Sequence, residues 1–297
     1  MIWNKSINRV GSAEKAEGRA KNIHPGAFIF LLLWSIYVLI PFYIMFILSI
    51  KTQHEANYTT FSWWVKEGIT FSAYSKVFVN DFGGCTILSG FRNTLVYTIP
   101  TVVTGIFVGT MAAYSWAKLK WKGKKFIFPY MMARMMLPSC ITMTSQYVMF
   151  SAINWVGTPL PLMVPGMFCG IAQIFFMKQF MTTIPNDLLD AAKADGLGAF
   201  GVFIKIVLPI SLPAVFTQII FCFISMYNDY LNPLLYLEDP ELYTLQIALK
   251  FYSETYKNNT PVIMAGSLVA IMPTLIIFIL AQDFILKGIN IGSGLKF

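Results

Sequence analysis

The sequence predicts an all-α integral membrane protein with six transmembrane helices. Of its 297 residues, 56% are hydrophobic and only 12% are charged, whereas charged residues make up about 25% of a typical soluble domain. Six stretches are apolar enough to cross a bilayer, for which a helix needs about 20 mostly apolar residues. The formal net charge is +8, which favours anionic lipid headgroups over nucleic acid as neighbours of this chain.

Hydropathy places the six spans in order along the chain. Uncharged runs at Pro25–Ile50 and Asn93–Ala117 give the first two. The next uncharged run, Met135–Met177, is too long for one helix, and the turn-forming stretch "NWVGTP" divides it into two. Ile206–Asn228 and Asn258–Gln282 are the remaining uncharged runs. The predicted spans are therefore 27–50, 92–117, 126–150, 160–181, 214–237 and 262–286.

The positions of lysine and arginine predict the orientation. The tail before the first span carries five of them, and the loop 118–125 carries five more. The loops expected on the opposite side share six over much longer lengths. Because cytoplasmic loops are enriched in lysine and arginine, we expect cytoplasmic tails at 1–26 and 287–297, flanking a membrane domain of residues 27–286. No cleavable signal peptide is expected, since no A-x-A-like site follows the first apolar run.

The predicted cytoplasmic loop 182–213 holds a charged stretch between two apolar spans, "NDLLDAAKADGLGAFGVFIKIVLPISLP". A short helix is expected over Asp187–Asp195. Asn186 would be its N-cap, and Asp187 and Asp190 would lie near the positive end of the helix dipole. Such a helix exposes charges and small side chains, which suits docking against another protein.

Glycine and proline mark the end of this helix and the segment after it. Gly196 follows Asp195 and is expected to take the left-handed conformation that ends many helices. A second apolar piece, Phe200–Leu208, then runs to Pro209 and Pro213, which are expected to mark the start of the fifth span. On composition alone, the simpler interpretation is an amphipathic connector lying at the lipid headgroups.

The order of residues in this loop resembles a known pattern. Asp190-Ala191-Ala192, then Gly196, and then Ile206-Val207-Leu208-Pro209 are similar to the EAA loop of permease subunits of ATP-binding-cassette (ABC) importers. Aspartate at 190 stands where that family usually has glutamate, which shortens the reach of the carboxylate but keeps its charge. The resemblance implies docking on a separate ATPase through Asp187, Asp190, Ala191, Ala192, Asp195, Gly196 and Pro209.

The resemblance extends over most of the chain. Ser225–Leu245, "SMYNDYLNPLLYLEDPELYTL", is similar to the Trp-Asn-Asp/Glu segment of the second permease of sugar importers, with Tyr227 in place of Trp. "MMLPSCITMTSQYVMF" after Arg134 resembles the third span of that family. The C-terminal "ILKGINIGSGLKF" resembles its Gly-rich tail without the usual final Lys-Gly. The family is that of the maltose-type permeases of the carbohydrate uptake group.

That resemblance implies a six-helix permease fold of the type I ABC importers, and a set of partners. The chain would form half of a translocation pathway with a homologous permease subunit. Two ABC ATPase subunits and an extracytoplasmic solute-binding protein would complete the importer. The chain itself contains no G-x-x-x-x-G-K-[ST] phosphate loop. We therefore expect ATP and Mg on the partner ATPase, and neither a cofactor nor enzymatic activity in this chain.

Polar residues within apolar spans are costly in hydrocarbon, so they are candidates for contact with the solute. Tyr227, Asn228, Asp229 and Asn232 cluster late in the predicted fifth span. Amide and carboxylate groups can bind sugar hydroxyls, and tyrosine adds an apolar face. The alternative is that these residues only cap a helix terminus.

Other polar and sulfur-containing residues are less specific. Gln146 and Gln173 could line the pathway or bridge helices. Arg134 could face the pathway, pair structurally or reach the headgroups. The methionines of the third span suit adaptable packing or a pathway lining. The cysteines and histidines have no spacing typical of a metal or redox site, so no metal or catalytic residue is expected; they are Cys85, Cys140, Cys169, Cys222, His24 and His54.

Two other classes of protein remain as alternatives. A self-sufficient secondary transporter would need carboxylates or ion sites within its spans, and only Asp229, near a span end, qualifies. A membrane-embedded enzyme should show clustered histidine, aspartate or glutamate, which the sequence lacks. The solute stays open: the resemblance implies a neutral mono- or oligosaccharide, but sugar acids and polyols are alternatives.

Overall fold

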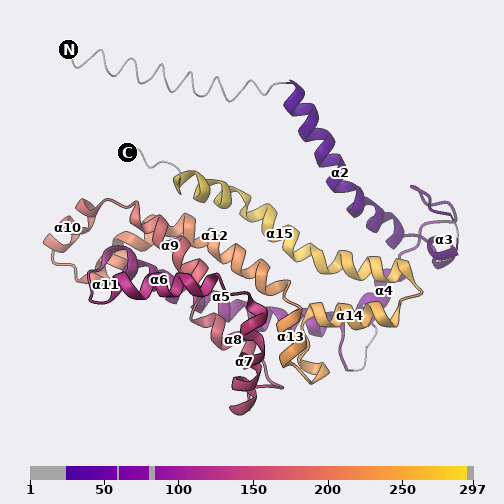
Figure 1. Ribbon diagram of the computed structural model, residues 1–297. Helices are drawn as coiled ribbons and strands as arrows, with labels where there is room; N and C mark the ends of the chain where they lie inside the picture. The colour runs from indigo at the N-terminus through magenta and orange to yellow at the C-terminus, as the bar shows by residue number, and fades with distance from the viewer. Residues whose placement is uncertain (1–24, 59, 80–83, 293–297) are drawn as a thin grey trace.

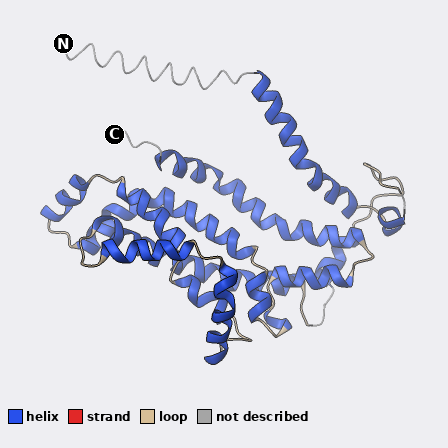
Figure 2. Ribbon diagram, in the orientation of Figure 1, coloured by secondary structure: helices blue, strands red, loops and turns tan. Residues whose placement is uncertain are grey.

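The computed structural model describes residues 25–58, 60–79 and 84–292, and every regular element within these ranges is helical (Figure 2). The predicted tail 1–26 therefore lies almost entirely outside the described residues, as does the end of the C-terminal tail. The helices are α2 Pro25–Ser49, α3 Gln53–Tyr58, α4 Ser72–Val79, α5 Ile87–Lys118, α6 Lys124–Met135, α7 Ser139–Ala152, α8 Leu160–Met167, α9 Ile171–Thr182, α10 Asn186–Ala194, α11 Ala199–Val202, η1 Phe203–Val207, α12 Leu208–Tyr227, α13 Leu231–Tyr236, η2 Pro240–Leu242, α14 Leu245–Thr255 and α15 Thr260–Gly292.

The long helices confirm the all-α membrane fold. In the described residues, five helical segments are long and apolar enough to cross a membrane, and a bent pair of helices, α6 and α7, makes up to six. The five are Pro25–Ser49, Ile87–Lys118, Leu160–Thr182, Ala199–Tyr227 and Thr260–Gln282. α10 lies at one end of the bundle, whereas α3 and α14 lie at the other, and α2 leans away from the remaining helices (Figure 1).

The third span is not the continuous helix that we predicted over 126–150. It is divided into α6 and α7, whose axes differ by 102°. Leu137 and Pro138 lie at the break. Proline lacks the N–H needed to continue a helix and disfavours helical conformation in the residue before it, so the break falls where the backbone is least able to remain helical.

The fifth span differs from the predicted 214–237 at both ends. Its helix begins at Ala199 and ends at Tyr227, so the apolar piece after Gly196 is part of the span. The helix passes Pro209 without stopping, directly after the π turn η1, in which the N–H of Leu208 donates to the carbonyl of Phe203. Prolines 209 and 213 therefore lie in the first turns of α12, inside a helical span that begins at Ala199. Our prediction that they mark the start of the fifth span was wrong.

Helix α5 is the centre of the bundle and packs against α8, α9, α12 and α14. Gly105 and Gly109 form a G-x-x-x-G pair on the side of α5 where α8 gives way to α9. A Cβ atom at Gly105 would overlap the carbonyl oxygen of Gly166, and one at Gly109 would overlap Sγ of Cys169. Small residues at this spacing allow two membrane helices to approach closely. The fourth span therefore contacts α5 most closely at the break between α8 and α9.

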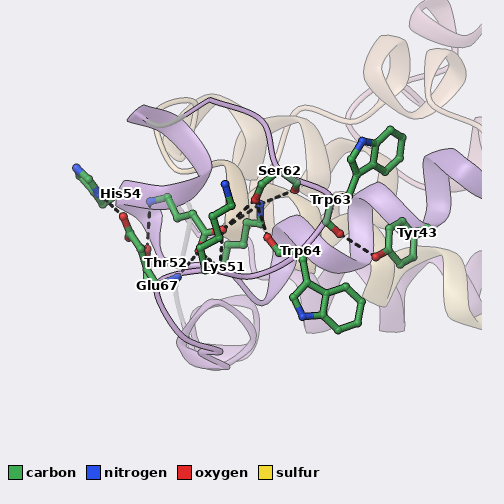
Figure 3. Close-up of polar contacts among 10 residues, drawn as sticks. Tyr43, Lys51, Thr52, His54, Ser62, Trp63, Trp64 and Glu67 are labelled. Atoms are coloured by element: carbon green, nitrogen blue, oxygen red, sulfur yellow. Dashed lines mark hydrogen bonds and ion pairs between the residues drawn. The ribbon is translucent and has the colours of Figure 1, made fainter.

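A folded loop follows the first span, at the end of the bundle away from α10 (Figures 1 and 3). The ammonium group of Lys51 lies 3.1 Å from the carboxylate of Glu55, and both side chains are almost fully buried. Lys51 also donates to the carbonyl and the hydroxyl of Ser62, each at 2.8 Å. The Glu55 carboxylate accepts hydrogen bonds from the backbone N–H groups of Lys66 and Glu67 at 3.0 to 3.1 Å.

These contacts determine the charge state of Glu55. Burial raises the pKa of its carboxyl, but hydrogen bonds from the Glu67 backbone, Lys51 and the Lys66 backbone outweigh that effect, so the pKa lies below its ordinary value. The loop is also joined to the span, because the hydroxyl of Tyr43 in α2 donates to the carbonyl of Trp63 at 2.8 Å. We call residues 50–71 the clasp loop.

Candidate functional site

Helix α10 forms an elbow between α9 and the fifth span, at the tip of the bundle (Figure 1). It covers Asn186–Ala194, one residue earlier than predicted. We expected Asn186 to cap the helix, but no side chain caps the N-terminus of α10. Oδ1 of Asn186 instead accepts a hydrogen bond from the ammonium group of Lys118 at 3.0 Å. Lys118, at the end of α5, also donates to the carbonyl of Ile184. A long-range contact with α5 thus replaces the local cap and holds the start of the elbow.

The end of α10 confirms the conformation predicted for Gly196. Its φ is +88°. The N–H of Gly196 donates to the carbonyl of Lys193 at 3.0 Å, and the N–H of Leu197 donates to that of Ala192 at 3.1 Å. This pair of bonds is the Schellman motif, which satisfies the last carbonyls of a helix and reverses the chain.

The two faces of α10 differ in their surroundings. Leu189 and Ala192 are 3% and 6% exposed and pack in a core with Val202, Phe203 and other residues of this chain. Ala192 therefore does not present its side chain to a partner, contrary to our expectation. Pro209 is exposed. The outward face of α10 consists of exposed residues, among them Asp187, Leu188, Asp190, Ala191, Ala194 and Asp195.

The outward face carries three carboxylates and one ion pair. Lys193 donates to Asp190 at 2.8 Å, and both side chains are more than half exposed. This hydrogen bond holds the pKa of the Asp190 carboxyl below its ordinary value, so the carboxylate stays ionised at neutral pH. The other two carboxylates, Asp187 and Asp195, are exposed, which leaves an acidic face with Ala191 between the charges.

A second candidate site lies where α7, α8 and α13 meet. A cavity of about 350 Å³ there brings together Gln146 of α7, Asp229 of the α12–α13 link and Asn232 of α13. Asn232 donates to Asp229 through its side chain at 2.7 Å and through its backbone N–H at 3.3 Å. Asp229 thus lines the cavity and also accepts a hydrogen bond from a backbone N–H in the first turn of α13. We call this space the outer cavity.

The structure separates the other predicted pathway residues from the outer cavity. The hydroxyl of Tyr227 donates to the carbonyl of Ala270 at 2.8 Å, and its ring is fully buried between α12 and α15. Asn228 donates to the carbonyl of Ile224, one turn back in its own helix. Arg134 is exposed in the last turn of α6, with no ion pair among the described residues. Tyr227 is therefore part of the core, and Asn228 is the C-cap residue of α12.

The less specific candidates are distributed over the bundle. Gln173 lines a smaller cavity, of about 130 Å³, at the α8–α9 interruption, and Met149 lines the outer cavity. Cys85 is buried and Cys140 is exposed, while the other two cysteines are partly buried. His54 lies 2.9 Å from Glu67 in the clasp loop, and His24 lies outside the described residues. Among the described residues, no group of histidine, cysteine, aspartate or glutamate could hold a metal.

Sequence reasoning missed Tyr236 as a lining residue of the outer cavity. It lies four residues after Asn232 on α13, and residues at that spacing share one face of a helix. This spacing was a signal available in the sequence, because it holds in the predicted span 214–237 as well as in α13.

The chain resembles known proteins over most of its length. Residues 105–290 match the family described as "Binding-protein-dependent transport system inner membrane component". A permease protein of an arabinooligosaccharides transport system from Bacillus subtilis is 29% identical over 271 residues, covering 89% of this chain and 93% of the relative. The protein of the same name from Halalkalibacterium halodurans is 31% identical over 203 residues, covering 68% and 72%.

A further relative and a solved structure agree with that match. The melibiose/raffinose/stachyose import permease protein of Bacillus subtilis is 27% identical over 256 residues, covering 86% of this chain and 90% of the relative. A chain in the crystal structure of a bacterial ABC transporter involved in import of the acidic polysaccharide alginate superimposes with a TM-score of 0.74 at 21% identity. The superposition covers 88% of this chain and 98% of the other. At that identity the structural match concerns the fold.

Proposed function

Because the chain belongs to the family of binding-protein-dependent transport system inner membrane components, we propose that it forms half of the translocation pathway of an ATP-driven sugar importer. Its place in the membrane is that of a multi-pass inner-membrane subunit, and it works with other components of an ABC importer. It is a transport subunit and not an enzyme. The alternative of a self-sufficient secondary transporter finds no support in this membership.

The observation that carries the proposal is the elbow at α10. It is held at both ends, by Lys118 at its start and by the Schellman motif at its end. Its inward face packs on this chain, while its outward face is exposed and acidic. A rigid, exposed helix with no chemistry of its own is suited to receive motion from another protein. The proposed partner is the ATPase of the importer, which would also hold ATP and Mg.

The proposed assembly pairs this chain with a homologous permease subunit, two ATPase subunits and a solute-binding protein. In it, the elbow and the loop 118–125 face the cytoplasm, and the clasp loop faces outward. The concentration of lysine and arginine at the elbow end of the bundle supports this orientation.

The proposed solute is a neutral sugar or short oligosaccharide. Relatives are named for arabinooligosaccharides and for melibiose, raffinose and stachyose. The outer cavity offers amide and carboxylate groups, which bind hydroxyls well. A sugar acid is the alternative, since the solved transporter of the same fold is described as importing alginate.

The elbow proposal is tested by placing a bulky side chain on the outward face. Ala191→Trp should weaken retention of the ATPase during co-purification about 5- to 150-fold, because an overpacked contact costs about 1–3 kcal/mol. The permease should still fold, since Ala191 is exposed. The matched control is Lys122→Trp, an equally exposed position at the same end of the bundle outside the elbow.

Ala192→Trp tests the inward face of α10, whereas Ala191→Trp tests the outward face. Because Ala192 is buried in this chain, that variant should reduce the amount of folded permease and should not act on ATPase binding alone. If Ala191→Trp retained the ATPase and transported normally, the elbow would be only a connector.

A further inference from the structure

We propose that the outer cavity is a subsite for one neutral sugar ring and that the hydroxyls of Tyr236 and Thr244 are contacts to it. This inference rests on the proposed function, since it names the part of the pathway that the sugar would occupy. Neither residue was a candidate from the sequence.

A smaller cavity adjoins the outer cavity. The cavity of about 350 Å³ is lined by Gln146, Phe150, Asn232 and Tyr236, among others. A neighbouring cavity of about 30 Å³ is lined by Thr94, Tyr97, Thr98 and Thr244, among others. The two share Asp229 and Leu162. Asp229 thus lines both spaces, with Tyr236 in the lining of the first and Thr244 in the lining of the second.

The Tyr236 hydroxyl is exceptional among the buried tyrosines. Tyr236 is 2% exposed, and its hydroxyl has no hydrogen-bond partner among the described residues. The other four buried tyrosines each donate to a backbone carbonyl at 2.8 to 3.1 Å; they are Tyr97, Tyr114, Tyr227 and Tyr252. Because buried hydroxyls are nearly always paired, an unpaired one on a residue that lines a cavity points to a partner bound in that cavity.

Thr244 repeats this pattern independently. It is 5% exposed and lies at the N-cap of α14, where a threonine hydroxyl ordinarily accepts from the helix backbone. Its side chain makes no such bond, and Oγ1 has no partner among the described residues. The hydroxyl therefore does not make the capping bond that is usual for a threonine at this position, which leaves it available to a group bound in the smaller cavity.

The rings around Tyr236 give the outer cavity an aromatic wall. Tyr236 meets Phe150 edge-on, with ring centroids 5.4 Å apart, and stacks with Tyr147 at 6.2 Å. Phe150 in turn stacks on Trp155. A cavity lined by aromatic rings together with amides and a carboxylate suits a sugar ring, which has an apolar face and a polar rim.

Charge and size narrow the ligand further. The Asp229 carboxylate can accept from a sugar hydroxyl but would repel a uronate carboxylate. A volume of about 350 Å³ is near the lower end of the ~300–1,000 Å³ typical of small-ligand pockets. This volume suits one sugar ring with its hydroxyls and not a whole oligosaccharide.

Two substitutions that each remove only a hydroxyl test the subsite, with the whole importer reconstituted in liposomes. The probes are arabinotriose, raffinose, stachyose and maltotriose as neutral sugars and trigalacturonate as an acidic one. Tyr236→Phe and Thr244→Val should each lower uptake of the transported neutral sugar about two- to twelvefold, the effect of one lost hydrogen bond. The thermal stability of the permease should stay equal or rise, because the hydroxyl that is removed has no partner in the protein.

Tyr227→Phe is the matched control. Its hydroxyl is equally buried but is bonded to Ala270, so its loss should lower thermal stability and leave uptake per folded permease unchanged. A purely structural Tyr236 would behave like Tyr227, and that result would overturn the subsite.

The remaining outcomes are also decisive. Normal uptake by both Tyr236→Phe and Thr244→Val would overturn the subsite while leaving the sugar importer intact. Loss of the second permease from these two variants would show that the cavity receives a partner side chain, which also overturns it. Uptake of trigalacturonate alone would overturn the neutral class, and uptake of no probe by the unmodified importer would count against the proposed function itself.

Discussion

Gly196 shows how a single backbone conformation can be tested without changing packing. Its φ is +88°, and a Cβ atom added there would have no heavy atom within 4 Å. The cost of a side chain is therefore confined to the backbone. Gly198, two residues on, is equally open but has a φ of −69°.

This difference between the two glycines predicts opposite effects of the same substitution. Gly196→Ala should lower stability by about 1–2 kcal/mol, the cost of the left-handed conformation for a residue with a Cβ atom. Gly198→Ala should leave stability unchanged or raise it slightly, because alanine restricts the unfolded chain. The midpoint of thermal unfolding in detergent measures both, and equal midpoints would contradict the role assigned to Gly196.

Residues 186 and 196 also show what could be predicted locally. The left-handed glycine after a short helix was predictable because its cause lies within the adjacent turn. The role of Asn186 was not, because Lys118 lies 68 residues away in the sequence and competes for the same side chain. Tyr227 is a similar case. A tyrosine within a span was a candidate for contact with the solute, but its hydroxyl donates to the carbonyl of Ala270 on α15 and its ring is part of the core.

Among the structural elements, the clasp loop depends on one buried ion pair. Lys51 and Glu55 are four residues apart, as are Lys250 and Glu254 in α14. The second pair is 3.8 Å apart and largely exposed. The two pairs thus share the same spacing in the sequence, while their burial differs.

Burial predicts a large difference between the two pairs. Lys51→Met should destabilise the loop by about 3–5 kcal/mol, because it leaves a buried carboxylate without its cation. Lys250→Met should cost at most about 1 kcal/mol, as exposed pairs do. Hydrogen exchange of residues 50–71 measures the effect, and similar protection in the two variants would show that the buried pair is not what holds the loop.

The same loop should respond to acid in a defined direction. The pKa of Glu55 in the folded loop is lower than its ordinary value, so its ionisation stabilises the fold above the unfolded pKa of about 4.3. That contribution is lost as the pH falls through the lowered pKa of the folded state. Protection of the loop should therefore be constant near neutrality and decline only in acid.

Elements differed from prediction where proline was involved. Pro138 breaks the third span, whereas Pro209 and Pro213 lie inside a continuous helix. Proline removes the same hydrogen bond in each case. The outcome depends on the neighbouring backbone: a π turn precedes Pro209. Hydropathy therefore predicted that the spans exist, but it could not predict which of their prolines interrupt them.

At the scale of the whole molecule, the positions of basic residues predict which end faces the cytoplasm. In a variant without native cysteines, Lys122→Cys and Ala194→Cys, both exposed at the elbow end, should resist a membrane-impermeant thiol reagent in intact cells. Ile69→Cys, exposed in the clasp loop at the other end, should react. The measurement is labelling before and after lysis, and labelling of the elbow cysteines before lysis would reverse the orientation.

The whole molecule also determines which polar residues meet. Gln146 and Asp229 are far apart in the sequence and share a cavity only because α7 and the α12–α13 link converge. Single polar residues within spans could be proposed as pathway candidates from the sequence, because placing them in hydrocarbon is energetically costly. Their grouping, and the inclusion of Thr244, required the fold.

The uninterrupted helix from Ala199 to Tyr227 makes the fifth span a lever arm. Its 29 residues measure about 43 Å at 1.5 Å per residue. The π turn at 203–207 lies near the end that adjoins the elbow, and Phe203 and Val207 are fully buried there, so we expect this point to act as a pivot. A tilt of about 10° there would displace the far end, about 33 Å away, by roughly 6 Å. Asp229 follows shortly after that end and lines the outer cavity, so if a partner moves the elbow as proposed, we expect a small rotation there to change the width of the outer cavity.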